Sequence, residues 1–112
     1  MHLRYKLWLD SGGKAFGDGP HALLEGVQRT GSLSRACAEM GMSYNKAWRL
    51  MREMERRLGF VLIERRTGGL EGGGSELTPE AIELMRRYRC LKTDADECLQ
   101  DLYRKHFGTS EP

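Results

Sequence analysis

The sequence predicts an α+β fold that is mostly helical. Stretches in which apolar residues recur three and four positions apart predict four helices. Two pairs of short extended segments, each joined through glycine-containing turns, predict two β-hairpins. The chain has 112 residues, 39% hydrophobic and 30% charged, which is the size and composition of one soluble globular domain. Because no apolar run is long enough for a membrane helix or a secretion signal, we expect a cytoplasmic protein.

The first hairpin is predicted at the N-terminal end of the chain. Residues 3–9 carry an apolar or aromatic side chain at every second position, which is the period of a strand. Residues 10–13 contain two glycines and predict a turn. Residues 14–17 then return as a second short strand, with Phe16 directed at the core.

Two helices follow, and their ends are marked by capping residues and glycines. The first is expected to begin at Pro20, since proline suits the first helical position, and to stop before Gly31. The second is expected over residues 33–40, with Ser32 and Ser34 as candidate N-caps.

A third helix is predicted over residues 44–58, between Ser43 as the N-cap and Gly59. Its apolar residues share one face, which we expect in the core: Ala47, Met51, Met54 and Leu58. The opposite face is basic and polar, with Asn45, Arg49, Arg52 and Arg56. Arginine donates two hydrogen bonds to guanine and asparagine pairs with adenine, so this face suits base recognition. Trp48 lies between the two faces, and we interpret it as a packing residue; the alternative is a residue that stacks on bases.

A second hairpin with a glycine-rich tip follows the third helix. Residues 61–63 predict a short strand, residues 67–75 contain five glycines, and residues 76–77 predict the partner strand. A phosphate-binding loop is excluded because Gly74 is not followed by the required lysine and Ser/Thr. The three helices and the glycine-tipped hairpin that follows them form the layout of a winged helix-turn-helix. In that fold one helix enters the DNA major groove, and the loop of the hairpin, called the wing, contacts the DNA backbone.

The middle of the chain is basic although the whole chain is nearly neutral. Nine basic and four acidic residues lie between Arg29 and Arg66, a net charge of +5, whereas the whole chain carries +2 and the remainder therefore −3. Such a surface suits a polyanion, although a solvated basic helix surface would have the same composition. The residues expected to contact DNA are Ser43, Tyr44, Asn45, Lys46, Arg49, Arg52, Arg56, Arg65 and Arg66.

A long last helix is predicted from Thr78 and Pro79 up to Gly108. Its apolar residues repeat as a heptad seam, which the helix could also pack against its own domain, as we expect for its first half. The 29 residues span about 43 Å, more than a domain of this size can cover, so the distal half should pack on another subunit. We therefore expect a homodimer whose interface includes Tyr88, Leu91, Ala95, Cys98, Leu99 and Leu102. The expected division is a DNA-binding domain over residues 1–78, a dimerisation helix over 79–107 and a disordered tail over 108–112.

No residue pattern predicts catalysis or a metal site. Cys37, Cys90 and Cys98 form no C-x-x-C pair, and the three histidines lie far apart in sequence. We therefore expect neither an enzyme nor a bound cofactor.

Four segments of the chain resemble the N-terminal domain of ModE-type molybdate-responsive transcription regulators. These are residues 31–38, the Ser-Tyr-x-x-Ala-Trp step within 41–48, residues 64–69, and residues 72–74 with Leu77 and Thr78. LysR-type regulators are more distantly similar, since they share the helix-turn-helix but not the glycine loop. The resemblance spans roughly residues 3–107 and implies a dimeric winged-helix DNA-binding protein with its recognition helix at 44–58.

The resemblance does not extend to effector binding. Regulators of this type sense molybdate through C-terminal oxyanion-binding domains, for which the 112 residues leave no room. We therefore expect a stand-alone form that works without an effector or with a separate effector-binding protein. The function expected is sequence-specific binding of double-stranded DNA by a homodimeric transcription regulator; the alternative is a protein-interaction module that kept the fold without reading DNA.

Overall fold

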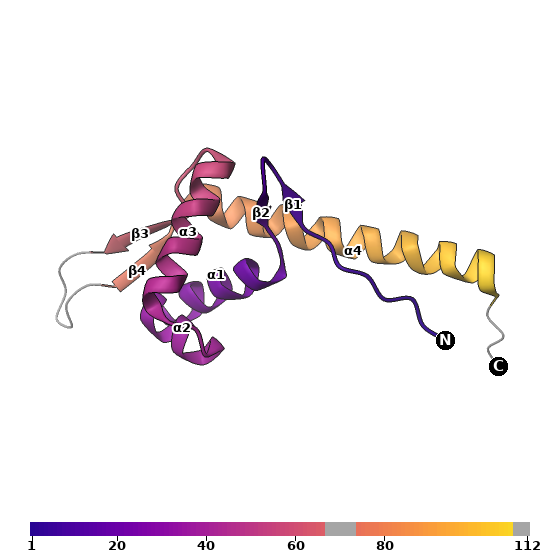
Figure 1. The fold of residues 1–112 in the computed structure, drawn as a ribbon, viewed down its shortest axis with the longest axis horizontal. Helices are drawn as coiled ribbons and strands as arrows, with labels where there is room; N and C mark the ends of the chain where they lie inside the picture. Colours follow the sequence, from indigo (N-terminus) through magenta and orange to yellow (C-terminus); the bar gives the residue numbers. More distant parts are fainter. Residues whose placement is uncertain (67–73, 109–112) are drawn as a thin grey trace.

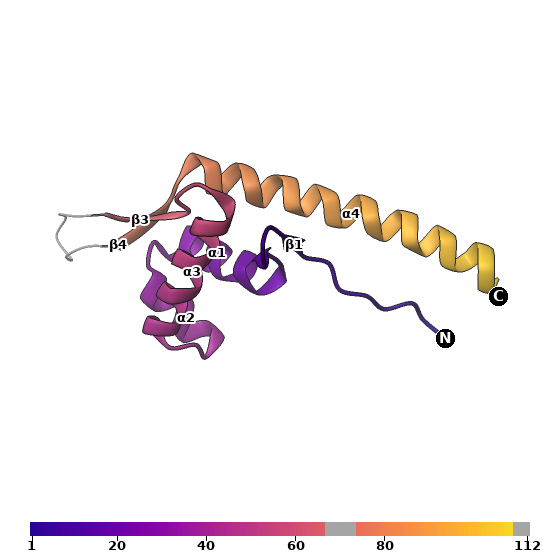
Figure 2. The same cartoon turned by 45° about the horizontal axis from the view of Figure 1, so that its top comes forward.

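A computed structural model describes residues 1–66 and 74–108 of the chain (Figure 1). Its elements in chain order are β1 (Leu9–Asp10), β2 (Lys14–Phe16), α1 (Asp18–Thr30), α2 (Leu33–Met40), α3 (Tyr44–Leu58), β3 (Ile63–Arg66), β4 (Gly74–Leu77) and α4 (Pro79–Phe107). The helices α1, α2 and α3 pack together at one end, and α4 extends away from them along the longest dimension of 59 Å (Figures 1 and 2). The fold is thus α+β and mostly helical, as predicted.

Three helices have the predicted bounds because a hydroxyl side chain fixes the start of each. The Ser32 hydroxyl accepts a hydrogen bond from the Arg35 amide at 3.1 Å, and the Ser43 hydroxyl accepts one from the Lys46 amide at 3.1 Å. At α4, the Thr78 hydroxyl accepts one from the Ala81 amide at 3.0 Å. The alternative cap of α2, Ser34, lies inside that helix.

Helix α1 begins at Asp18, two residues earlier than predicted. Pro20 lies in the first turn, where amide groups have no helical acceptor, so its missing N–H costs nothing. Gly26 lies further along α1 against α2, and a Cβ there would be 2.8 Å from the Cβ of Ala36. The close approach of α1 and α2 therefore depends on this glycine.

The prediction of a strand over residues 3–9 is wrong for all but its last residue, because β1 contains only Leu9 and Asp10. Residues 1–8, which we name the arm, run beside α4 instead (Figure 1). The Tyr5 hydroxyl donates to Asp96 at 2.6 Å, and the Tyr103 hydroxyl donates to the Met1 carbonyl at 2.8 Å. Leu3 and Leu7 of the arm are half-buried, whereas Tyr5 between them is exposed and held by its hydroxyl.

The strand predicted over 61–63 is displaced, because β3 begins only at Ile63. The amides of Leu62 and Ile63 donate to the buried Glu55 carboxylate at 2.7 and 3.3 Å, so a helix side chain takes the place of a partner strand. Strands β3 and β4 are antiparallel, with Ile63 opposite Leu77 and Arg66 opposite Gly74. Residues 67–73 of the predicted glycine loop and 109–112 of the predicted tail lie outside the described residues.

The core lies between α1, α2, α3 and the first turns of α4. Its largest fully buried side chains include Phe16, Leu23, Met51, Ile63 and Met85. Ala47, Met51 and Met54 of α3 are buried as predicted, while Leu58 is half-buried. Burial of this face leaves the opposite face of α3 directed at solvent.

Candidate nucleic-acid interface

The outer surface of α3 is formed by the residues that the buried face leaves outside. All seven residues that the sequence assigns to DNA binding on this segment are exposed: Ser43, Tyr44, Asn45, Lys46, Arg49, Arg52 and Arg56. A hollow of about 500 Å³ lies on this surface, and its lining holds three arginines against one carboxylate: Trp48, Arg49, Arg52, Glu53 and Arg56. The surface is therefore cationic and continuous along the helix.

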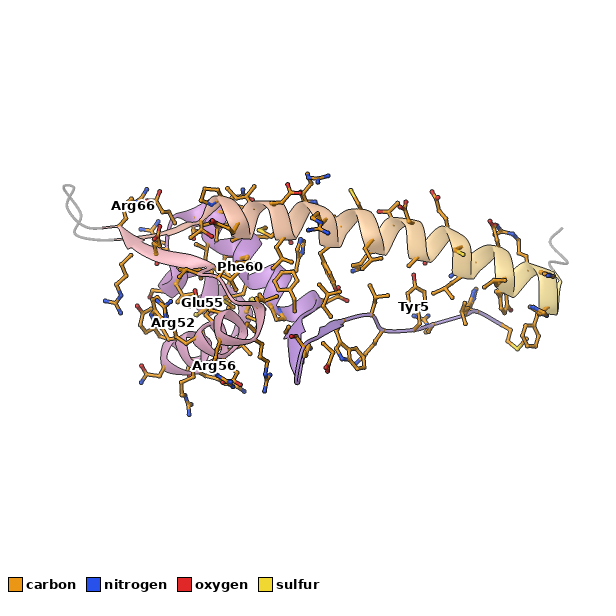
Figure 3. The ribbon with its side chains drawn as sticks, turned by 90° about the horizontal axis from the view of Figure 1, so that it is seen from above. Tyr5, Arg52, Glu55, Arg56, Phe60 and Arg66 are labelled. Carbon is orange, nitrogen blue, oxygen red and sulfur yellow. The ribbon has the colours of Figure 1, made fainter. Side chains whose placement is uncertain are left out.

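The three arginines of the outer surface differ in how they are held. Arg52 forms an ion pair with Glu55, both labelled in Figure 3. Arg56 forms one with Glu53. Among the described residues, Arg49 has neither an ion pair nor a hydrogen-bond partner for its side chain. Arg49 can thus approach a new acceptor without first leaving a carboxylate.

Trp48 packs against the core and also lies close to the guanidinium groups of two arginines. Its half-buried ring lies edge-on to Tyr44, with the ring centroids 6.2 Å apart. The guanidinium carbon of Arg52 lies 4.3 Å from the ring centroid of Trp48, and that of Arg65 lies 5.2 Å from it. The spacing of Tyr44, Trp48 and Arg52 by four residues places them on one side of a helix and is visible in the sequence. The approach of Arg65 from β3 depends on the tertiary structure.

Arg65 and Arg66 lie on opposite faces of the β3–β4 hairpin, as consecutive strand residues do. A guanidinium nitrogen of Arg65 lies 3.4 Å from the Tyr44 hydroxyl, on the α3 side. The Arg66 guanidinium lies instead beside Gly31 and Gly74, where the nearest nitrogen would be 3.1 and 3.0 Å from an added Cβ. The sequence alone predicts the same role for both arginines, whereas in the structure their side chains lie on different faces of the hairpin.

The hairpin is fixed to the turn between α1 and α2. The Ser75 amide donates to the Gly31 carbonyl at 2.9 Å, and the Leu33 amide donates to the Ser75 hydroxyl at 3.4 Å. A Cβ on Gly74 would lie 2.7 Å from the Gly31 carbonyl oxygen, so the approach requires a glycine. These contacts hold the hairpin beside α3 at a set position.

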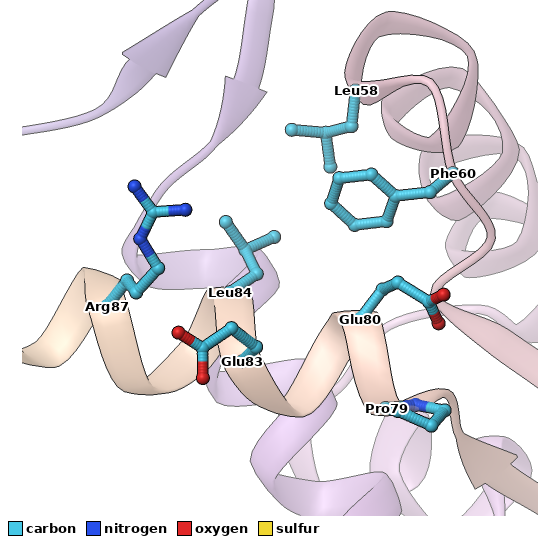
Figure 4. A pocket seen from close by; sticks show the side chains of 7 residues that line it. All are labelled: Leu58, Phe60, Pro79, Glu80, Glu83, Leu84 and Arg87. Atoms are coloured by element: carbon cyan, nitrogen blue, oxygen red, sulfur yellow. The ribbon is translucent and has the colours of Figure 1, made fainter.

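A second surface lies where the start of α4 meets the end of α3. Leu58, Phe60 and Leu84 line a groove of about 440 Å³, with Glu83 and Arg87 at its edge (Figure 4). No sequence pattern indicated this groove, because its walls come from two segments that the β3–β4 hairpin separates in the sequence.

The predicted dimer residues of α4 divide into three groups. Leu91 and Leu102 are 42% and 45% exposed, and Cys98 is exposed as well. Ala95 and Leu99 are half-buried. Tyr88 is only 1% exposed and belongs to the core of its own chain, so its assignment to a surface between two chains is wrong.

The position of Tyr88 is fixed by polar contacts at its hydroxyl. It donates to Asp18 at 2.8 Å and lies 3.1 Å from the Leu7 carbonyl oxygen. Burial and the hydrogen bond to Asp18 raise the pKa of Tyr88. Hydrogen bonds from Lys92 and Tyr88 lower the pKa of Asp18. The heptad position could not reveal that this tyrosine has partners inside its own chain.

Two further properties concern the described part of the chain as a whole. Within residues 1–66 and 74–108, no group of three or more His, Cys, Asp or Glu side chains is arranged to hold a metal ion. No helix among these residues is both long and apolar enough to cross a membrane.

Comparisons with known proteins agree with this architecture. The molybdenum transport protein ModE of Herbaspirillum seropedicae is 44% identical over 71 residues, which are 63% of this chain and 26% of that protein. The transcriptional regulator ModE of Yersinia pestis is 40% identical over 72 residues, 64% of this chain and 27% of that protein. The chain thus spans about a quarter of the length of these relatives.

A solved structure described as a complex of the CbnR DNA-binding domain with DNA has the same fold. It matches with a TM-score of 0.55 and 24% identity, over 75% of this chain and 94% of that one, which confirms the winged helix-turn-helix. The family model of the bacterial regulatory helix-turn-helix proteins of the lysR family matches residues 22–82. The chain belongs to this family.

Proposed function

We propose that the protein is a transcription regulator that binds double-stranded DNA in a sequence-specific manner, with α3 in the major groove. The observation that carries the proposal is the outer surface of α3, which presents basic and amide side chains, while Ala47, Met51 and Met54 on the opposite face are buried. The family description and the relatives named as transcriptional regulators support the same function.

Arg49 and Asn45 are the proposed base-reading residues. They lie one helical turn apart on the exposed side of α3 and are free of carboxylate partners among the described residues. Both side chains form bidentate hydrogen bonds with bases in the major groove. Tyr44, Lys46, Arg52 and Arg56 flank them and serve the DNA backbone, whose contacts position the protein without reading sequence.

The start of α3 is a proposed phosphate contact. The Ser43 hydroxyl satisfies the Lys46 amide, and the Ser43 carbonyl accepts from the Ala47 amide at 3.0 Å. The amides of Tyr44 and Asn45 precede these bonds and point out of the helix end. Such free amides, together with the positive end of the helix dipole, favour a phosphate.

The hairpin is proposed to contact the DNA backbone next to α3. Arg65 lies on the α3 side of the hairpin and is therefore assigned the stronger phosphate contact. Arg66 lies on the other side near Gly31, and we assign it a weaker contribution. The glycine-rich wing, residues 67–75, would let the backbone approach the DNA closely.

A homodimer is proposed through the surface of α4. One side of the helix carries side chains at intervals of seven, seven and four residues: Leu84, Leu91, Cys98 and Leu102. Leu84 also lines the groove beside Phe60, so this side of the helix is continuous with the groove. We name Leu91, Cys98 and Leu102 the distal stripe. A two-fold axis through such a surface would let two α3 helices meet half-sites about 34 Å apart or a multiple of that distance.

The proposed division into parts follows these assignments. Residues 1–78 would bind DNA and residues 79–107 would form the dimer. The first turns of α4 belong to both, since Ala81, Met85 and Tyr88 are buried in the core.

The test is a binding titration with genomic fragments at several salt concentrations. Affinity should fall steeply with salt, in proportion to the phosphates neutralised, and some fragments should be retained far better than others. Fragments next to molybdenum-related genes come first, because one relative is named a molybdenum transport protein. Equal, weak retention of all fragments would favour the protein-interaction module instead.

A further inference from the structure

We infer that Trp48 is a positioning residue for DNA binding, whose indole ring presets the guanidinium of Arg65 beside the reading surface of α3. The inference rests on the proposed function. It adds Trp48 as a residue that affects DNA binding by positioning Arg65, without contacting the DNA itself. Trp48 belongs to α3 and Arg65 to β3, so the contact joins the two elements that are proposed to bind DNA.

The ring of Trp48 is fixed before any ligand arrives. It packs against the hydrophobic core on one side and lies edge-on to Tyr44. The Arg65 guanidinium carbon lies 5.2 Å from the ring centroid, within the range in which a cation is attracted to an aromatic face. A weak bond between Arg65 and the Tyr44 hydroxyl, at 3.4 Å, sets the direction of the same group.

A second chain of contacts runs from Trp48 to the base of the hairpin. The Arg52 guanidinium lies 4.3 Å from the ring centroid and forms an ion pair with Glu55. The carboxylate of Glu55 in turn accepts hydrogen bonds from the backbone amides of Leu62 and Ile63. Trp48 is therefore linked to β3 through Arg65 and, independently, through Arg52 and Glu55.

This arrangement has a consequence for affinity. A free arginine must lose many rotamers when it contacts a phosphate, and this loss weakens binding. A guanidinium already held over an indole ring has lost part of that freedom in the unbound protein. The value of Arg65 for DNA binding should therefore depend on Trp48.

A double-mutant cycle on the full chain tests this dependence. Arg65→Ala should weaken DNA binding roughly fivefold and lower the salt slope by about one. Trp48→Leu should weaken DNA binding by a similar factor, whereas Trp48→Phe, which keeps an aromatic face, should retain most of the affinity. Arg65→Ala in the Trp48→Leu background should add little further loss. Trp8→Leu, at a 52% exposed tryptophan of the arm, is the matched control and should bind like the wild type.

A measurement on the unsubstituted protein guards against a variant that fails to fold. In its NMR spectrum, the side-chain protons of Arg65 should be shifted upfield by the ring of Trp48, and those of Arg66 on the opposite face should not.

Each outcome has one meaning. Losses that multiply independently in the cycle, or an Arg65 side chain without the upfield shift, would overturn the inference while leaving DNA binding intact. Failure of the proposed function is seen separately, as weak binding of the wild type that Arg49→Ala does not change.

Discussion

Two exposed helical surfaces of this chain differ in how well water solvates their side chains. The outer surface of α3 exposes guanidinium and amide groups, which water solvates well, so it is stable without a partner. The distal stripe of α4 exposes leucines, and burial of such side chains is favourable by about 25 cal/mol per Å². The difference teaches that a ligand of the α3 surface has to compete with water, whereas a partner that covers the α4 surface gains by displacing water from it. The predictions below test this difference.

The largest effect is expected from charges in the distal stripe. Leu91→Asp together with Leu102→Asp should convert the dimer to a monomer and weaken binding to a two-half-site operator by about 100-fold or more, because linked half-sites raise the effective concentration. Light scattering and a binding titration measure both quantities. Thr93→Asp, on another side of α4, is the control. A wild-type protein that is monomeric at micromolar concentration would contradict the dimer.

On the other surface, Arg49→Ala should weaken binding to a specific site by about 1–3 kcal/mol and relax the preference at one base position. The reason is that Arg49 has no carboxylate partner among the described residues and can bond a base directly. Binding to a library of operator variants checks the position. Arg86→Ala, at an arginine of α4 that pairs with Glu83, should leave both affinity and preference unchanged.

The scaffold that orients α3 can be tested through two glycines of α1. Gly26→Ala should destabilise the protein by about 1–3 kcal/mol, since the added Cβ would meet the Cβ of Ala36 at 2.8 Å. Gly19→Ala has nothing within 4 Å and should be neutral or stabilising by up to about 1 kcal/mol. Denaturant unfolding compares them, and equal stabilities would show that α1 and α2 are not packed as described.

A smaller contrast is expected between the two arginines of β3. Arg65→Ala should lower the salt slope of DNA binding by about one, whereas Arg66→Ala should lower it less, because Arg66 lies on the far side of the hairpin. Base preference should stay the same in both variants. The reverse order of the two slopes would mean that the hairpin presents its other face to DNA.

The smallest effect concerns pH and the histidine beneath α4. Burial lowers the pKa of His21. The nearby charges of Arg89 and Lys92 lower this pKa further, whereas the charge of Glu25 raises it. A lowered folded-state pKa means that the contribution to stability is present above about pH 6.5 and is lost as the pH falls below it. Asp18, whose pKa is also lowered, adds a loss at more acidic pH. Thermal unfolding of wild type and His21→Phe between pH 7.5 and 5.5 should show a steeper decline in the wild type.

The sequence predicted most accurately those elements whose boundaries are decided locally. Helices α2, α3 and α4 begin at a hydroxyl cap and end at a glycine, so a few adjacent residues determine each end. The outward side of α3 followed from helical periodicity for the same reason. These signals depend on neighbours in sequence and need no knowledge of the tertiary structure.

The features that were missed or wrong depend on distant residues. Most of the segment expected as a strand over 3–9 lies along α4 instead, where Tyr5 donates to Asp96. The strand expected at 61–63 begins later because the Glu55 carboxylate accepts the Leu62 amide. Tyr88 fits the heptad seam, yet its hydroxyl has partners at Leu7 and Asp18. Periodicity shows which side of an element is buried but not what buries it.

The arm imposes an order of events during biosynthesis. Its contacts join residues 91 and 102 positions apart, between Tyr5 and Asp96 and between Met1 and Tyr103. A nascent chain cannot form them until α4 has left the ribosome, and loops of this length close at an entropic cost. The helices α1 to α3 have their caps and turns complete much earlier. Docking of the arm should therefore follow the packing of α1 to α3, and its amides should exchange with solvent sooner than those of these helices.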